Sequence, residues 1–139
     1  MKHRQTGVAL IELALILPLL LLLTIITTEF GRSLYQYNVI TKSMRDAARY
    51  LSVELSSTRI EEARKLVVYG NPDGTGSPLV PGLTLANVAV TQGTAGSNPV
   101  INTVTVTVSG YTFQSMFNSV FGVTFGNITY SDINATMRA

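Results

Sequence analysis

The chain has 139 residues, a formal net charge of +2, no cysteine and one histidine, His3. Its length fits a single domain with a membrane segment, and without cysteine it holds neither disulfides nor thiolate metal sites. Because the chain beyond His3 has no histidine, Ser-His-Asp and Cys-His catalysis and His-ligated zinc are excluded there, and we expect neither an enzyme nor a metal or organic cofactor.

The most apolar stretch runs from Val8 to Ile26 and contains one charge, Glu12, and one proline, Pro18. Its nineteen residues would make a helix of roughly 28 Å, close to the ~30 Å hydrocarbon core of a bilayer. Only a helix satisfies its own backbone hydrogen bonds in lipid. The stretch therefore predicts a transmembrane helix over residues 8–28.

The charges on either side of this helix predict its orientation. Lys2 and Arg4 precede it, and the acid Glu29 follows it. The positive-inside rule then places the N-terminus in the cytoplasm and residues 29–139 outside. A secretory signal is the competing interpretation, but no A-x-A-like cleavage pattern follows the apolar run, so we expect the helix to be retained. Removing residues 1–7 would leave equal numbers of acidic and basic side chains, and nothing suggests a nucleic acid.

Glu12 is costly inside an apolar helix, and such residues are functional candidates by default. The simple interpretation is that its carboxylate reaches the membrane interface one turn into the helix. The alternative links it to Gly7: a cut after Gly7 would make Val8 the new N-terminus, with an amine five residues from a carboxylate. A charged partner would offset the cost of burying Glu12.

Pro18 and three threonines of this helix have predictable local effects. Pro18 lacks a backbone N–H and should kink the helix. The hydroxyls of Thr24, Thr27 and Thr28 are expected to bond to carbonyls four residues earlier, which reduces the cost of placing them in lipid.

The helix is predicted to continue outside the membrane to about residue 55, because apolar residues recur at steps of three and four. This apolar stripe needs a cover from the rest of the chain or from other subunits. The candidates for helix packing are Phe30, Leu34, Tyr37, Met44 and Leu51.

A second helix is predicted from about residue 59 to 69, with Thr58 and Glu61 as a capping box and Gly70 at its C-terminal end. Turn-forming residues then predict a loop over 71–82. We expect an ordinary loop, because its one carboxylate, Asp73, is too little for a calcium site.

Residues 83–139 are predicted to be rich in strands. Valine alternates with other residues around Val88–Val90 and again at Val100, Val104, Val106 and Val108, and residues 92–99 should form the hairpin loop between them. The valine face should pack on the amphipathic helix.

The end of the chain is less regular. Met116, Phe117, Val120 and Phe121 have helical spacing, which predicts a short helix or a loop held by its aromatic residues. A last strand is expected over 128–137, with a bulge at Asp132-Ile133. The predicted fold is α+β, with one long helix, a second helix and a small antiparallel sheet.

Residues 6–51 also resemble a known family. The short basic leader, Gly7 before Val8 and Glu12 as fifth residue after the cut resemble a type IV prepilin, although Leu13 stands where an aromatic is usual. The blocks that follow are similar to the TadE-like pseudopilin family of tight-adherence (Tad/Flp, type IVc) pilus systems: Glu29-Phe30-Gly31-Arg32, Tyr37-Asn38-Val39-Ile40-Thr41 and Ala47-Ala48-Arg49-Tyr50.

The resemblance implies a pilin-like fold and a minor pilin or pseudopilin that is cut at Gly7 by a prepilin peptidase and assembled through its N-terminal helix. Its implied partners are that peptidase, other pilin or pseudopilin subunits, the inner-membrane assembly platform and the membrane, with no small-molecule substrate. The implied location is the bacterial inner membrane and then the pilus outside the cell. An unprocessed, membrane-anchored protein that presents its outer domain for binding or adhesion is the alternative.

Overall fold

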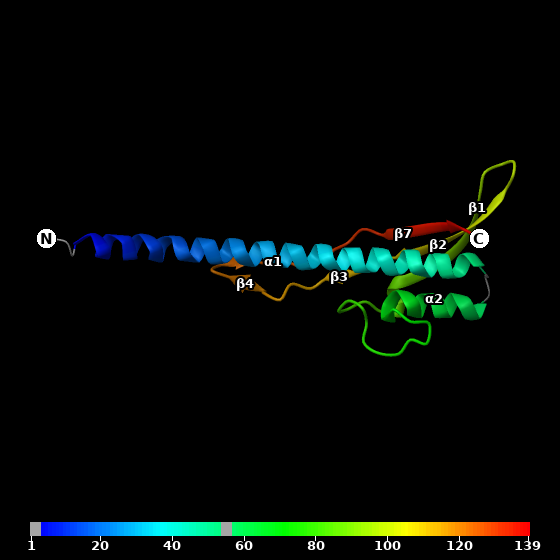
Figure 1. Ribbon diagram of the computed structural model, residues 1–139, viewed down its shortest axis with the longest axis horizontal. Helices are drawn as coiled ribbons and strands as arrows, with labels where there is room; N and C mark the ends of the chain where they lie inside the picture. The colour runs from blue at the N-terminus through cyan, green and yellow to red at the C-terminus, as the bar shows by residue number, and fades with distance from the viewer. Residues whose placement is uncertain (1–3, 54–56) are drawn as a thin grey trace. The chain divides into compact units, whose positions relative to one another are not determined.

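The computed structural model describes residues 4–53 and 57–139. Helix α1 extends over Arg4–Val53 and α2 over Ser57–Tyr69, followed by the short 3-10 helix η1 at Leu85–Asn87. The predicted long helix and second helix are confirmed (Figure 1). The helix continues through Pro18 without interruption, while the predicted end of the long helix near residue 55 lies outside the described residues.

The strands form one small sheet and two short pairs, all antiparallel. In the sheet, β2 (Ile101–Val108) lies between β1 (Val88–Ala95) and β7 (Ile133–Arg138). Outside it, β3 (Thr112–Phe113) pairs with β6 (Ile128–Thr129), and β4 (Ser119–Val120) pairs with β5 (Val123–Thr124). The predicted α+β fold is therefore confirmed.

The chain divides into two compact units, and α1 contributes to both. The N-terminal unit contains the first 34 residues together with Ser115–Gly126. The core unit contains Tyr35–Gln114 and Asn127–Ala139. Nothing in the sequence analysis indicated that residues 115–126 would join the N-terminal segment.

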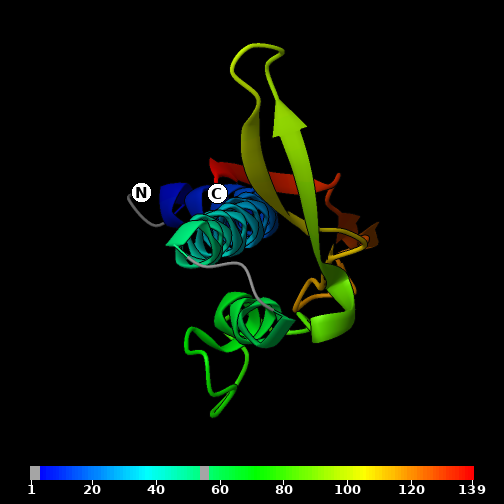
Figure 2. The ribbon, with the colours of Figure 1, turned by 90° about the vertical axis from the view of Figure 1, so that its right-hand side faces the viewer.

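The hydrophobic core of the core unit contains residues from α1, α2 and the sheet, and Figure 2 shows α2 and the sheet on different sides of α1. Val88 lies opposite Val108 and Val90 opposite Val106, which aligns the valines of both strands on one face. The predicted valine face is thus confirmed for Val104, Val106 and Val108, whereas Val100 lies before β2 and is exposed. The fully buried residues of this core include Ile40, Met44, Ala47, Ala48, Leu51, Ala63, Val67, Val68, Val104 and Val106.

Polar contacts at the edge of this core connect its elements. The Tyr50 hydroxyl donates a hydrogen bond of 2.5 Å to Glu62, which joins α1 to α2. The Arg64 guanidinium donates to the carbonyls of Val88 (3.1 Å) and Leu85 (2.7 Å), which joins α2 to η1 and β1. These charge-assisted bonds fix α2 against the start of the sheet.

The buried face of α1 differs from the predicted stripe at its beginning. Phe30, Leu34 and Tyr37 are exposed, and the buried positions there are polar: Glu29, Ser33 and Gln36. Hydrogen bonds compensate for the burial of polar side chains. In the core unit, the Tyr111 hydroxyl donates to Gln36 Oε1 at 2.8 Å. Within the chain, Tyr37 makes an edge-to-face ring contact with Tyr130 at 5.7 Å, and packing of Phe30 and Leu34 against other subunits stays a prediction.

The structure corrects two predictions about α2 and the first hairpin and confirms a third. Helix α2 begins at Ser57, so Thr58 lies inside it and cannot be the N-cap of the predicted capping box. Ser56 and Ser57 are equally good cap formers by residue type, which made the choice ambiguous. Strand β1 extends to Ala95, so the hairpin loop is shorter than the predicted 92–99. Gly70 follows α2 with a positive φ of 77°, as a C-terminal glycine should.

The C-terminal region also differs from the prediction. The segment around Phe117 and Phe121 forms the β4–β5 hairpin, so the predicted helix is wrong, and both aromatic rings are exposed, so they do not hold a loop in place. The predicted last strand is two strands: β6 pairs with β3, whereas β7 pairs with β2. The chain leaves one sheet and enters another where a bulge was predicted.

Candidate membrane and assembly segment

The first part of α1 is apolar on every side and has almost no cover. Leu15 is 75% exposed and Leu19 66%, although both are leucines in a long helix. Among the described residues, α1 is the one helix long and apolar enough to cross a membrane, and its most apolar window contains no buried residue. Water is a poor solvent for such a surface, which fits membrane anchoring.

Gly7, Val8 and Glu12 lie on the first turns of this uncovered helix. Val8 and Glu12 are four positions apart and therefore on the same face. Both are exposed, and a Cβ added at Gly7 would meet nothing within 4 Å. The described residues thus leave open space on all sides of the predicted processing and pairing positions.

The threonines near the end of the apolar run behave as predicted. The hydroxyls of Thr24, Thr27 and Thr28 each donate a 2.8 Å hydrogen bond to the carbonyl four residues earlier. Their polar groups are therefore satisfied within the helix, as a lipid environment requires. Whether Pro18 bends the helix stays a prediction.

Glu29 has a structural role that the sequence analysis missed. Its side chain is buried, with one oxygen accepting a 2.7 Å bond from Arg32 Nη1 and the other a 3.2 Å bond from the backbone N–H of Met116. The second bond joins α1 to the 115–126 segment, 87 residues later in the chain. The sequence signal for this role was an acid directly after the apolar run, with an arginine three residues later.

The segment attached by Glu29 ends in a tight hairpin. Val120 pairs with Val123, which leaves Phe121 and Gly122 as a two-residue loop with φ values of 51° and 81°. Positive φ at both positions is the signature of a type I′ turn. The N–H of Phe125 also donates to the carbonyl of Asn118 at 3.0 Å and closes the base of the hairpin.

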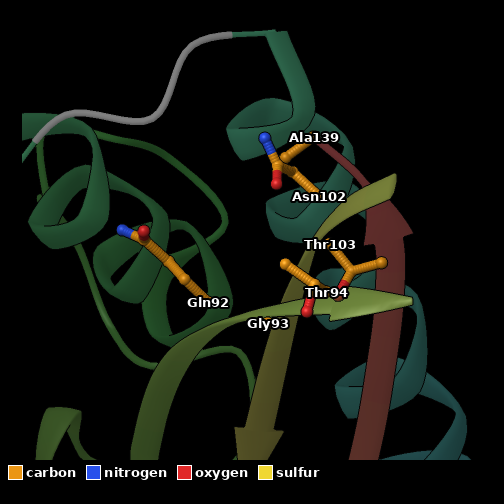
Figure 3. A pocket seen from close by; sticks show the side chains of 6 residues that line it. All are labelled: Gln92, Gly93, Thr94, Asn102, Thr103 and Ala139. Atoms are coloured by element: carbon orange, nitrogen blue, oxygen red, sulfur yellow. The ribbon is translucent and has the colours of Figure 1, made fainter. Parts of the chain in front are cut away.

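Two cavities lie among the described residues of the core unit. One of about 460 Å³ lies at the far end of β1 and β2, and Figure 3 shows its neutral side chains. They come from Gln92, Gly93, Thr94, Asn102, Thr103 and Ala139. A second, of about 270 Å³, is bordered by Lys42 and Asp46. Within residues 4–53 and 57–139, no group of three His, Cys, Asp or Glu side chains is placed to hold a metal ion.

An uncovered apolar helix that continues into a small α+β domain is the arrangement that the resemblance to pilins leads one to expect. Residues 7–49 match the model of a family described as TadE-like protein, which confirms the resemblance seen in the sequence. The match associates the chain with Tad pili, and the family is structural rather than catalytic. No curated protein and no solved structure matches the chain.

Proposed function

We propose that this chain is a minor pilin or pseudopilin of a tight-adherence pilus, cut between Gly7 and Val8 by a prepilin peptidase. The main support is the uncovered apolar half of α1, which has Gly7 and Glu12 at its start and is matched by the TadE-like family. In this proposal the helix first holds the subunit in the inner membrane, N-terminus inside, and then packs among other subunits. The assembly platform of the inner membrane would receive it there.

The position of Gly7 suits a peptidase. The bond to be cut lies in the first turns of α1, so the helix has to open locally to enter an active site. Glycine is about 1 kcal/mol less favourable than alanine inside a helix, which makes this turn easier to open. The absence of a side chain also lets the enzyme approach the backbone closely.

The cut would give Glu12 a partner. The new amine of Val8 would be a cation at a helix N-terminus, where the carboxylate of the same or a neighbouring subunit is attracted both by the charge and by the helix dipole. Pairing between subunits would set the offset of one helix against the next. Phe30 and Leu34, both exposed on α1, are then free to pack against other subunits.

Replacing Gly7 tests the cleavage. Gly7→Leu should abolish the loss of residues 1–7 when the chain is expressed with its peptidase, as measured by intact mass. Gly31→Leu is the matched control, because Gly31 also lies in α1 with nothing within 4 Å of an added Cβ, and this variant should be shortened normally. A wild-type chain that keeps Met1 while the peptidase is active would refute processing.

Replacing Glu12 tests the pairing. Glu12→Gln should be cut normally, because the bond to be cut lies elsewhere, but should no longer co-purify with the other pilus subunits. Glu61→Gln is the control, since it removes a carboxylate from an exposed α2 pair with Arg64 and should leave co-purification unchanged. Equal recovery of Glu12→Gln and wild type would favour an unprocessed membrane anchor that presents the outer domain.

A further inference from the structure

The tip of the β4–β5 hairpin has an unfavourable residue for its backbone conformation. Phe121 has a φ of 51°, a left-handed conformation in which a bulky side chain is strained, and Asn is the residue that type I′ turns favour at this position. The ring is also 64% exposed and so gains little from packing within the chain. Strain of this kind at an exposed site points to a function outside the folded domain.

The residues around Phe121 share its character. Met116 is 70% exposed, and Phe117 and Val123 are also exposed. We call these four side chains the hairpin patch. A short hairpin would be more soluble with polar residues at these positions, so the patch is suited to an apolar environment.

The β4–β5 hairpin lies beside α1, in the same compact unit as the apolar run (Figure 1). The bond from Met116 to Glu29 fixes one end of the segment just after that run. Leu22 and Ile25, on the same face as Glu29, are partly buried, whereas their apolar neighbours are exposed. From Glu29 to Leu22 the helix rises about 10 Å, so the segment accompanies the outer part of the run.

We propose that the hairpin patch inserts into the interfacial layer of the membrane, on the side where the α+β domain lies. This inference depends on the membrane anchoring proposed above. The patch belongs to the same unit as the apolar run of α1, and phenylalanine is among the side chains that interfacial segments bury at the boundary between headgroups and acyl chains. The hydrocarbon core itself is excluded, because a short hairpin exposes unpaired backbone groups there.

A single tryptophan tests the insertion, because the chain contains none. Full-length Phe121→Trp is reconstituted into phosphatidylcholine vesicles that carry bromine near the headgroup or deep in the acyl chains. We expect its emission to shift to the blue and to be quenched more by the shallow bromines. Val100→Trp, at an exposed loop residue of the core unit, is the control that should show no quenching.

A third variant separates this inference from the anchoring itself. Leu15→Trp should be quenched most by the deep bromines. If Leu15→Trp is not quenched, membrane anchoring fails and the inference fails with it. If Leu15→Trp is quenched but Phe121→Trp is not, anchoring stands and the insertion of the hairpin is wrong. Phe121→Trp emission that is blue-shifted without quenching would place the patch against protein, such as a second copy, and would also overturn the inference.

The variant Phe121→Asn tests the role of the ring without damaging the turn. Asn suits the left-handed position, so the hairpin should remain folded. With Phe117→Trp as the reporter, adding Phe121→Asn should reduce quenching by shallow bromines. Unchanged quenching would show that the ring of Phe121 contributes nothing to the contact with lipid.

Discussion

Helix α1 contains a first stretch, Val8 to Ile26, and a second stretch, Glu29 to Val53. The two stretches differ in what surrounds their leucines. In the first stretch Leu15 and Leu21 are exposed, with no cover from the described chain. In the second stretch Leu51 is fully buried in a core shared with α2 and the sheet. The same helix therefore places Leu15 and Leu21 on an exposed surface and Leu51 in a packed core.

This difference shows which part of the sequence is explained by folding. The apolar residues of the second stretch are accounted for by the core unit, where burial is worth roughly 25 cal/mol per Å². The residues of the first stretch gain nothing comparable within the chain. Their apolar character therefore reflects the surroundings of the protein, either lipid or the helices of other subunits.

Deleting the first stretch should have the largest effect on location and little effect on the fold. A chain that begins at Glu29 should stay soluble after membranes are pelleted, whereas the full chain should sediment with them. Its circular dichroism should show both helix and strand, with a cooperative thermal transition, because the core residues all lie after residue 29. A disordered spectrum would mean that other subunits complete the core.

Replacing one leucine in each stretch by alanine compares how much each side chain contributes to stability. Leu51→Ala leaves a cavity in the core and should lower the free energy of unfolding by about 2–5 kcal/mol. Leu21→Ala, at an exposed position of the first stretch, should change it by less than about 0.5 kcal/mol. Urea unfolding of the full chain in detergent micelles measures both, and equal effects would contradict the assigned burial.

The sequence predicted the elements whose residues follow a clear period. The apolar run, the outer helix and the alternating valines of β2 each have an unambiguous pattern, and each is present. The buried polar face near Gln36 was missed, because a partner such as Tyr111, 75 residues away, is invisible to local periodicity. Packing against distant residues overrode the apolar pattern there.

The hairpin of residues 115–126 was missed for a different reason. Its Phe-Gly loop lacks the Asn-Gly or Asp-Gly signal of a type I′ turn, and its spacing of apolar residues imitates a helix. Its attachment to Glu29 joins residues far apart in the chain. A conflict of this kind between local sequence and structure is expected at functional or strained sites.

The smallest predicted effect concerns the Tyr111 hydroxyl, which contacts Gln36 in the second stretch. The Tyr111 hydroxyl oxygen lies 2.8 Å from Gln36 Oε1 and 2.9 Å from the Pro81 carbonyl. Tyr111→Phe keeps the ring in the core but leaves both acceptors without this donor, which should cost about 1–3 kcal/mol. Tyr35→Phe is the control, because Tyr35 is exposed, and should change the stability by less than about 0.5 kcal/mol.

The urea midpoint of each variant in micelles measures this difference. A lower midpoint for Tyr111→Phe with an unchanged denaturant slope would mean that stability, not compactness, has changed. The buried polar face of α1 would then be held by specific hydrogen bonds to the rest of the core unit, in contrast to the exposed leucines of the first stretch. If the two variants unfold at the same midpoint, water replaces the lost donor at Gln36, and the polar face contributes little to the stability of the core unit.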